Sequence, residues 1–179
     1  MNLLFAHNYA ELFGVPVTAL RFFTVYGPWG RPDMSPMIFA RKILAGEPLE
    51  VFNFGKHRRD FTYIDDIVEG VVRVLVKPPV ANPAWDAVTA SPSSSRAPFR
   101  ICNIGHSEPV ELLYFIGLLE RALGREAHKT LLPMQPGDVE NTYADISRLG
   151  AEIGYRPDTP IEAGVERFVA WFADYYGVR

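Results

Sequence analysis

The chain has 179 residues, of which 48% are hydrophobic and 22% charged, and its formal net charge is −3. These values describe a globular chain with room for one core and one or at most two small domains. The Lys and Arg residues are scattered rather than gathered into a run, so we do not expect a nucleic acid partner.

The sequence also bears on compartment and membrane. The single cysteine, Cys102, cannot form an internal disulfide bond. Residues 1–14 lack the basic region and the small-residue cleavage site of a secretory signal, so we expect a cytoplasmic protein. No stretch approaches the roughly 18 consecutive apolar residues that a membrane span requires, so a membrane protein is not expected.

The start of the chain predicts a helix, a strand and a loop. Residues 2–13 favour a helix that ends at Gly14, because glycine is common just past a helix C-terminus. Residues 15–26 are β-branched, aromatic and apolar almost throughout, which is typical of a strand buried on both faces of a parallel sheet. The Pro/Gly-rich residues 27–36 follow, where α/β folds place loops that contact ligands.

Further elements continue the alternation. The spacing of apolar residues and the positions of turn residues predict helices over residues 37–45 and 109–123. The same signals predict strands over residues 49–54, 60–64, 99–104 and 127–132. The loop 78–98 is rich in Pro, Ser and Ala and too long for a plain connection. It is either mobile or a functional lid, and we expect mobility.

Two further helices carry start signals. Asp65 and Asp66 stand where helix caps belong. An apolar pattern follows at Val68, Val71, Val72 and Leu75. The last helix has an N-cap, a first-turn proline and a capping-box partner in Thr159, Pro160 and Glu162. Its apolar face is formed by Val165, Phe168, Val169, Phe172 and Tyr176.

Three polar clusters could carry chemistry, but each also has a plain structural explanation. They are Arg21, Thr24, Tyr26 and Arg31; then Lys56, Arg58 and Arg59; and finally Gln135, Pro136, Gly137 and Asp138. Isolated arginines commonly form weak ion pairs, a basic turn can simply be solvated, and a Pro/Gly turn needs no ligand. His57, inside the second cluster, is assigned no function. Taken singly, the clusters do not decide what the protein does.

Three segments that include most of these residues resemble the extended short-chain dehydrogenase/reductases. The segments are LRFFTVYGPWGRPDM (residues 20–34), RDFTYIDDIV (residues 59–68) and LPMQPGDVENTYAD (residues 132–145). The resemblance covers essentially the whole chain and is strongest to UDP-glucuronate 4-epimerases, which interconvert UDP-glucuronate and UDP-galacturonate. UDP-xylose-forming decarboxylases and nucleotide-sugar dehydratases share the strand motifs.

The resemblance implies an α/β fold with part of a doubly wound, Rossmann-like sheet and a small α/β substrate-binding domain. Residues 1–30 would be a remnant of the NAD-binding domain and residues 31–179 mainly the nucleotide-sugar-binding domain. Within the latter, residues 59–77 would return to the Rossmann sheet and residues 78–98 would be the mobile loop. We expect a homo-oligomer, since self-association would hide apolar strand edges and the family dimerises through the first helix.

The resemblance also implies how a UDP-sugar is bound. Arg59 is similar to the arginine that binds the diphosphate, and Phe52 to the aromatic residue that packs on the uracil. A core position remains the alternative for Phe52. Asp138 resembles the acidic residue that bonds the ribose. Gln135 stands where several related epimerases carry an arginine, so one positive charge is missing here.

Further positions are similar to those that contact the sugar or the cofactor. Thr24 stands where related epimerases have a polar residue that reaches the substrate. Arg31 matches the arginine expected to hold the uronate carboxylate, because a planar guanidinium suits a carboxylate. Phe22 and Tyr26 resemble positions that line the nicotinamide of NAD.

The catalytic parts of the family are not recognisable in the sequence. Such enzymes use NAD to remove hydride from C4 of the sugar and return it to the other face of a 4-keto intermediate. There is no Gly-x-x-Gly-x-x-Gly turn and no Tyr-x-x-x-Lys pair, and Tyr9 is followed by Phe13 at the fourth position. We expect the catalytic Tyr and Lys to lie upstream of Met1, and no catalytic or metal-binding residue is predicted in this chain.

Two interpretations therefore stay open. In the first, the chain is the C-terminal, substrate-binding part of a UDP-glucuronate 4-epimerase and is inactive by itself. In the second, it is a non-catalytic module that binds a UDP-sugar or oligomerises. The same part of a related dehydratase or decarboxylase is a variant of the first interpretation.

Overall fold

The computed structural model describes residues 2–178, so Met1 and Arg179, at the ends of the predicted domain ranges, lie outside the described residues. The helices are α1 (Asn2–Phe13), α2 (Ser35–Ala45), α3 (Ile64–Leu75), α4 (Leu112–Leu123), α5 (Ser147–Ile153) and α6 (Ile161–Tyr176). The strands are β1 (Val17–Phe22), β2 (Thr24–Tyr26), β3 (Leu49–Val51), β4 (Arg58–Tyr63), β5 (Phe99–Ile104), β6 (Pro109–Glu111) and β7 (Lys129–Leu131). The predicted α/β class is confirmed.

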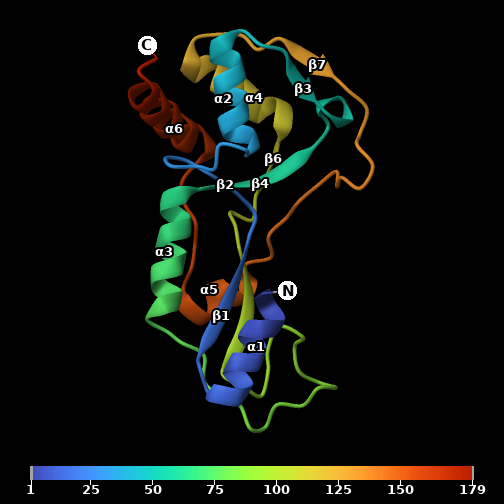
Figure 1. Cartoon of the computed structure of the whole chain (residues 1–179), viewed down its shortest axis with the longest axis vertical. Helices are drawn as coiled ribbons and strands as arrows, with labels where there is room; N and C mark the ends of the chain where they lie inside the picture. Colours follow the sequence, from blue (N-terminus) through green and yellow to red (C-terminus); the bar gives the residue numbers. More distant parts are fainter. Residues whose placement is uncertain (1, 179) are drawn as a thin grey trace.

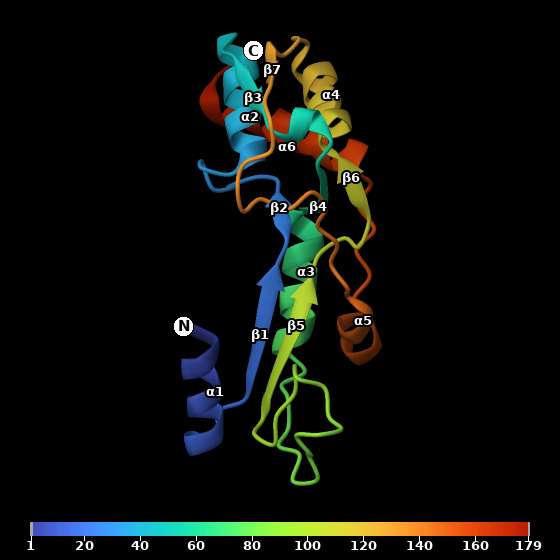
Figure 2. The ribbon, with the colours of Figure 1, turned by 90° about the vertical axis from the view of Figure 1, so that its right-hand side faces the viewer.

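The strands form three small sheets that follow one another along the long axis of the molecule (Figure 1). β1 pairs with β5 in parallel, and β3 pairs with β7 in parallel. β4 lies between β2, to which it is parallel, and β6, to which it is antiparallel. Helices α2, α4 and α6 gather at one end, while α1 and α5 lie near β1 and β5 at the other (Figure 2).

The two larger of three hydrophobic cores lie toward the two ends, and a small third one joins α1 to β1 and β5. The larger core joins α2, α4 and α6 to β2 and β4, and Phe115 and Phe168 are completely buried in it. The second core lies between α3, β5 and α5, with Ile104 and Leu149 at its centre. Burial of such side chains stabilises each by roughly 1.5–3 kcal/mol, so each end has its own source of stability.

The predicted strand 15–26 is divided in the structure. β1 ends at Phe22 and β2 begins at Thr24, and the two join different sheets. The prediction that this strand is buried on both faces is wrong. Within the described part of the chain β1 has β5 as its one neighbouring strand, and Phe22 is 53% exposed. The predicted parallel pairing itself is confirmed in both halves of the divided strand.

The predicted caps of α3 and α6 bond to each other instead. α3 begins at Ile64, so Asp65 and Asp66 lie in its first turn rather than at the cap. The carboxylate of Asp66 accepts hydrogen bonds from the backbone N–H of Thr159 at 3.3 Å and from its hydroxyl at 3.0 Å. Thr159 therefore does not cap α6, whose N-cap is Pro160. The tertiary contact between Asp66 and Thr159 thus replaces the two helix caps that the sequence predicts.

Other boundaries also differ from those predicted. β3 ends at Val51 because Asn53 and Phe54 adopt left-handed φ angles of 52° and 51° and form a short 3-10 turn, η1 (Asn53–Gly55). Residues 109–111 form β6 rather than the start of a helix. Helix α5 was not predicted.

Residues of the loop 78–98 form hydrogen bonds with one another and an ion pair with helix α1. Trp85 Nε1 donates to the Ser94 hydroxyl at 3.1 Å. Arg96 forms an ion pair with Glu11 of α1 at 3.0 Å. These contacts attach the loop to the first helix, and its mobility stays a prediction.

Many apolar side chains face solvent. The apolar pattern of α3 lies on its outer side, with Val68, Val71, Val72 and Leu75 between 39% and 77% exposed. On α6, Tyr176 is 46% exposed although the rest of its predicted face is buried. Self-association would cover such surface and stays a prediction. Within residues 2–178, no helix has the length and apolar character needed to cross a membrane.

Asp60, in the middle of β4, joins segments that are distant in sequence. Its fully buried carboxylate accepts backbone hydrogen bonds from His106 at 2.8 Å, from Ser107 at 2.9 Å and from Ala144 at 2.9 Å. The backbone N–H of Asp60 donates to the Thr142 hydroxyl at 3.0 Å. The turn after β5 and the segment before α5 are thus both fixed to β4.

Replacing Asp60 by Asn should destabilise the chain by about 3 kcal/mol, because an amide NH₂ would face backbone donors that then lack an acceptor. The measurement is the free energy of unfolding in urea. As a control, Asp158→Asn, at an exposed position in the loop before α6, should change it by less than about 0.5 kcal/mol. Equal effects of the two substitutions would contradict the role of Asp60.

Candidate functional site

A cavity of about 520 Å³ opens between α2, β3 and the start of β4. We call it the Arg59 cavity. Its lining residues are Asp33, Ser35, Ile38, Phe39, Lys42, Leu49, Glu50, Phe52, His57, Arg59, Leu112 and Asp138. Three residues predicted to bind a UDP-sugar, Phe52, Arg59 and Asp138, are therefore brought together here. The cavity combines apolar walls with a few charged groups, as small-molecule sites commonly do.

Arg59 and Asp138 form the charged centre of the cavity. The guanidinium Nη2 of Arg59 donates to Asp138 Oδ1 at 3.0 Å, and Nη1 donates to the Glu140 carbonyl at 2.9 Å and to the Arg58 carbonyl at 3.2 Å. Asp138 Oδ1 also accepts the backbone N–H of Val139 at 2.8 Å. The described residues thus occupy three of the five guanidinium N–H groups, so two remain for a ligand.

The backbone around β4 explains why residues so distant in sequence meet. The N–H of Arg58 donates to the Glu140 carbonyl at 3.0 Å, and the N–H of Thr142 donates to the Arg58 carbonyl at 3.1 Å. Asp138 itself closes a turn, since its N–H donates to the Gln135 carbonyl at 3.2 Å. The segment after β7 therefore runs along the start of β4 and delivers the Asp138 carboxylate to Arg59.

Phe52 lies on the rim between β3 and η1. Its side chain is half-buried, lines the cavity and is outside the main core cluster. Gly55 allows the η1 turn to pack closely, because it has a φ of 80° and a Cβ there would lie 2.6 Å from Leu113 Cγ. The ring is thus part of the cavity wall, and its contact with a base stays a prediction.

His57 is a site residue that the sequence analysis missed. Its side chain is 3% exposed and lines the cavity, with Nε2 3.2 Å from Asp138 Oδ2. Burial, helped by the positive charge of Arg59, lowers the pKa of His57 below its usual value, while Asp138 and Glu140 act in the opposite direction. The sequence held one signal for His57. In an extended chain residues two apart point to the same side, so His57 is expected on the side of Arg59.

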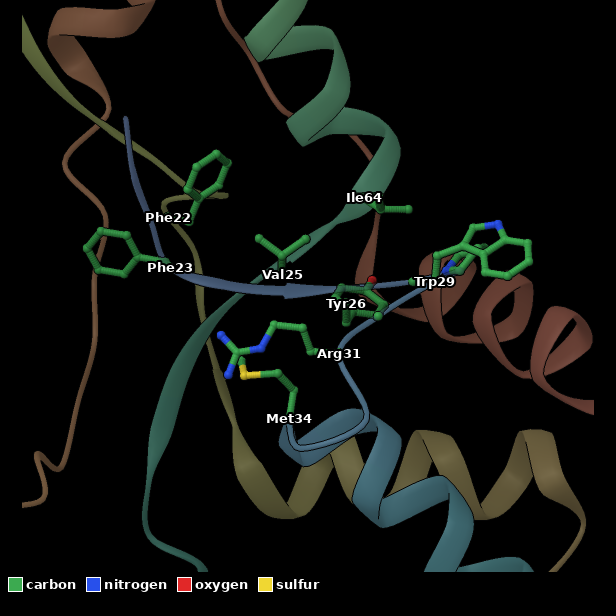
Figure 3. A pocket seen from close by; sticks show the side chains of 11 residues that line it. Phe22, Phe23, Val25, Tyr26, Trp29, Arg31, Met34 and Ile64 are labelled. Atoms are coloured by element: carbon green, nitrogen blue, oxygen red, sulfur yellow. The ribbon is translucent and has the colours of Figure 1, made fainter. Parts of the chain in front are cut away.

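A second cavity, of about 350 Å³, lies at the end of β2 (Figure 3). We call it the Trp29 cavity. Its lining residues are Phe22, Phe23, Val25, Tyr26, Gly27, Pro28, Trp29, Gly30, Arg31, Met34 and Ile64. In Figure 3 the Trp29 ring lies on one side of the view, away from the Arg31 and Met34 side chains. This cavity is largely aromatic and apolar, with one cation.

The loop 27–34 separates the two cavities. Arg31 lines the Trp29 cavity, and Asp33, two residues later, lines the Arg59 cavity. The two side chains form a bidentate ion pair at 3.1 Å and 2.5 Å, and the carboxylate of Asp33 raises the pKa of Arg31. The loop starts at Gly27, where φ is 135° and a Cβ would lie 2.5 Å from Ile64 Cγ2. Only glycine fits this approach.

The remaining predicted residues have different surroundings. Phe22 lines the Trp29 cavity and is half exposed. Tyr26 also touches that cavity, but its hydroxyl donates to the Ile161 carbonyl at 3.4 Å, and burial strongly raises its pKa. Thr24 lies on β2 and lines neither cavity. Gln135 is exposed and also lies outside both cavities.

Metal chemistry has no candidate ligand set in the described part of the chain, residues 2–178. No group of three or more His, Cys, Asp and Glu side chains comes together there in a way that could hold an ion. The chemistry available is that of cations, a carboxylate, an imidazole and aromatic surfaces.

The amino-acid sequence of the chain is similar to that of known proteins. Residues 2–85 match the model of the NAD dependent epimerase/dehydratase family. A probable UDP-glucuronate 4-epimerase of Rhizobium meliloti is 47% identical over 174 residues, which are 97% of this chain and 51% of that protein. Nearly the whole chain is thus similar to a protein of this kind, and almost half of it matches the family model. The cofactor of the NAD dependent epimerase/dehydratase family is NAD.

Two further known proteins are similar to the chain over nearly its whole length. An Escherichia coli O111:H- protein of 37.6 kDa is 51% identical over 99% of this chain. The crystal structure of the UDP-glucuronic acid 4-epimerase of Bacillus cereus, in complex with UDP-glucuronic acid and NAD, matches 95% of this chain with a TM-score of 0.76 and 32% identity. The match covers 49% of the Bacillus chain. The chain thus spans about half the length of its relatives in this family.

Proposed function

We propose that the chain is the UDP-sugar-binding part of a UDP-glucuronate 4-epimerase. The observation that carries the proposal is the Arg59 cavity, where a cation with free donors, a carboxylate and an aromatic rim meet. The similarity to the Bacillus cereus epimerase, whose structure holds UDP-glucuronic acid and NAD, supports the choice of ligand. The complete activity belongs to a protein about twice as long, in line with the lengths of the relatives.

The nucleotide would be bound in three places within the Arg59 cavity. The two remaining N–H groups of Arg59 bind the diphosphate, because charge-assisted bonds from a guanidinium to phosphate are short and directional. Phe52 packs on the uracil. Asp138 accepts hydrogen bonds from the ribose hydroxyls. Gln135, on the turn before Asp138, adds a neutral donor where a cation would bind more strongly.

The sugar would extend from the diphosphate toward the loop 27–34. Arg31 exchanges its pair with Asp33 for the carboxylate of the uronic acid, and both are exposed enough to rearrange. Thr24 on β2 would contact the sugar from the strand side. A guanidinium on a mobile exposed side chain can hold the carboxylate in both orientations of the turning sugar.

The Trp29 cavity fits one part of the NAD cofactor. Its aromatic wall, including Phe22 and Tyr26, suits the flat face of a nicotinamide ring. Bound NAD supplies the hydride acceptor and donor of the epimerisation. The sequence contains neither a Gly-x-x-Gly-x-x-Gly turn nor a Tyr-x-x-x-Lys pair, so we propose that this chain binds and orients substrate, whereas the proton-transfer groups come from the rest of the longer protein.

The first test is calorimetric titration of the purified 179-residue chain with UDP-glucuronate. We expect binding, and Arg59→Ala should weaken it by about 30-fold or more, because it leaves the diphosphate and Asp138 without their cation. The control Arg156→Ala, at an exposed site that lines neither cavity, should bind as the unchanged chain does. Absence of binding would instead favour a module that only oligomerises.

Recognition of the uronate is tested by a second pair of titrations. The chain should prefer UDP-glucuronate to UDP-glucose by about tenfold, the effect of one charge-assisted pair. Arg31→Ala should remove this preference while leaving UDP-glucose binding unchanged. If Arg31→Ala keeps the preference, another residue holds the carboxylate. If the unchanged chain shows no preference, an enzyme that acts on a neutral sugar becomes the better assignment.

A further inference from the structure

His57 carries a buried polar atom without a hydrogen-bond partner in the described chain. Nε2 of its imidazole is enclosed and unpartnered, although Asp138 Oδ2 lies only 3.2 Å away, off the direction that a hydrogen bond requires. Such atoms are rare in folded proteins because their desolvation is not compensated. His57 also lines the Arg59 cavity. The atom is therefore placed to gain a partner when the cavity fills.

Asp138 is the group that can supply this partner. Its Oδ1 accepts from Arg59 Nη2 at 3.0 Å, while Oδ2 faces His57. A diphosphate on the two free N–H groups of Arg59 shares the charge of the same guanidinium and so weakens its bond to Oδ1. Because Oδ2 already lies within contact distance of Nε2, a small rotation of the carboxylate brings the pair into hydrogen-bond geometry.

The charges around His57 determine which way its protonation responds. In the ligand-free chain, burial and Arg59 disfavour the imidazolium, and Asp138 and Glu140 favour it. The other charged residues on the surrounding elements are Asp33, Lys42 and Glu50, which line the cavity, and Arg58 and Glu111 at the paired ends of β4 and β6. A diphosphate adds negative charge beside Arg59, which offsets its repulsion of a proton on His57.

We propose that His57 is a positioning residue that takes up one proton from solvent when a nucleoside-diphosphate sugar binds Arg59, and that the resulting imidazolium holds Asp138 toward the ribose. The inference rests on the proposed function of the Arg59 cavity. In this step the neutral imidazole gains one proton from solvent, and the only other changes are in hydrogen bonds. Affinity should therefore rise as the pH falls from the pKa of His57 in the complex to its lower value in the free chain.

The test is titration of the 179-residue chain with UDP-glucuronate in two buffers that differ in ionisation enthalpy. This probe is suitable because neither its carboxylate nor its esterified diphosphate titrates near neutral pH. We expect an uptake of roughly half a proton or more at the pH of steepest dependence. His57→Gln, which keeps an N–H donor but does not titrate, should bind with no proton uptake. The control His128→Gln, exposed and outside the cavity, should keep the uptake.

A measurement on the unchanged chain covers the case in which His57→Gln does not fold. The pKa of His57 from its NMR chemical shifts should rise by about one unit or more when UDP-glucuronate saturates the chain. Binding without proton uptake, or with an unchanged pKa of His57, would overturn this inference and leave the proposed function standing. Failure of UDP-glucuronate to bind would overturn the proposed function, and this inference with it.

Discussion

The buried carboxylate of Asp60 is the constraint on which the arrangement of the site depends. It takes the backbone donors of His106, Ser107 and Ala144, so two loops that follow different strands are held against β4. Arg59 is the preceding residue on β4, and the segment that Ala144 ends is the one that delivers Asp138. One internal carboxylate thus ties the segment that carries Asp138 to the strand that carries Arg59.

Both cavities hold their arginine with a nearby carboxylate. Arg59 is paired with Asp138, and Arg31 is paired with Asp33. Such pairs keep long side chains ordered in the absence of an anion, at the cost of competing with it when it arrives. The Arg59 pair is partly buried and bridged to the backbone, which suits a fixed anchor. The Arg31 pair is exposed, so its guanidinium is freer to change partner.

Local signals in the sequence predicted most of the elements. Helix α1 was predicted with its observed bounds, and β5 likewise, because period and turn residues agree there. The meeting of Arg59 and Asp138, 79 residues apart, could be anticipated only from the family motifs. No periodicity in residues 15–26 marks the point at which the chain leaves one sheet for another, so the division at Phe23 could not be predicted.

Two of the failures share one physical cause, which is competition from contacts that are distant in sequence. Asp66 and Thr159 look like helix caps, yet each satisfies the other across 93 residues. Val68 and its neighbours on α3 look like a core face, yet they lie at the surface of the described chain. His57 looked like part of a solvated turn because nothing local shows that the segment after β7 covers it. Tertiary packing overrides local preference at Asp66, Thr159 and His57.

The central claim is that residues 2–178 form a UDP-sugar site at Arg59 without the rest of a family member. The most direct test is a crystal structure of the 179-residue chain with UDP-glucuronate. The account predicts the diphosphate on Arg59, the uracil against Phe52 and the ribose at Asp138. A uracil ring seated elsewhere, for instance in the Trp29 cavity, with Arg59 still paired only to Asp138, would contradict it.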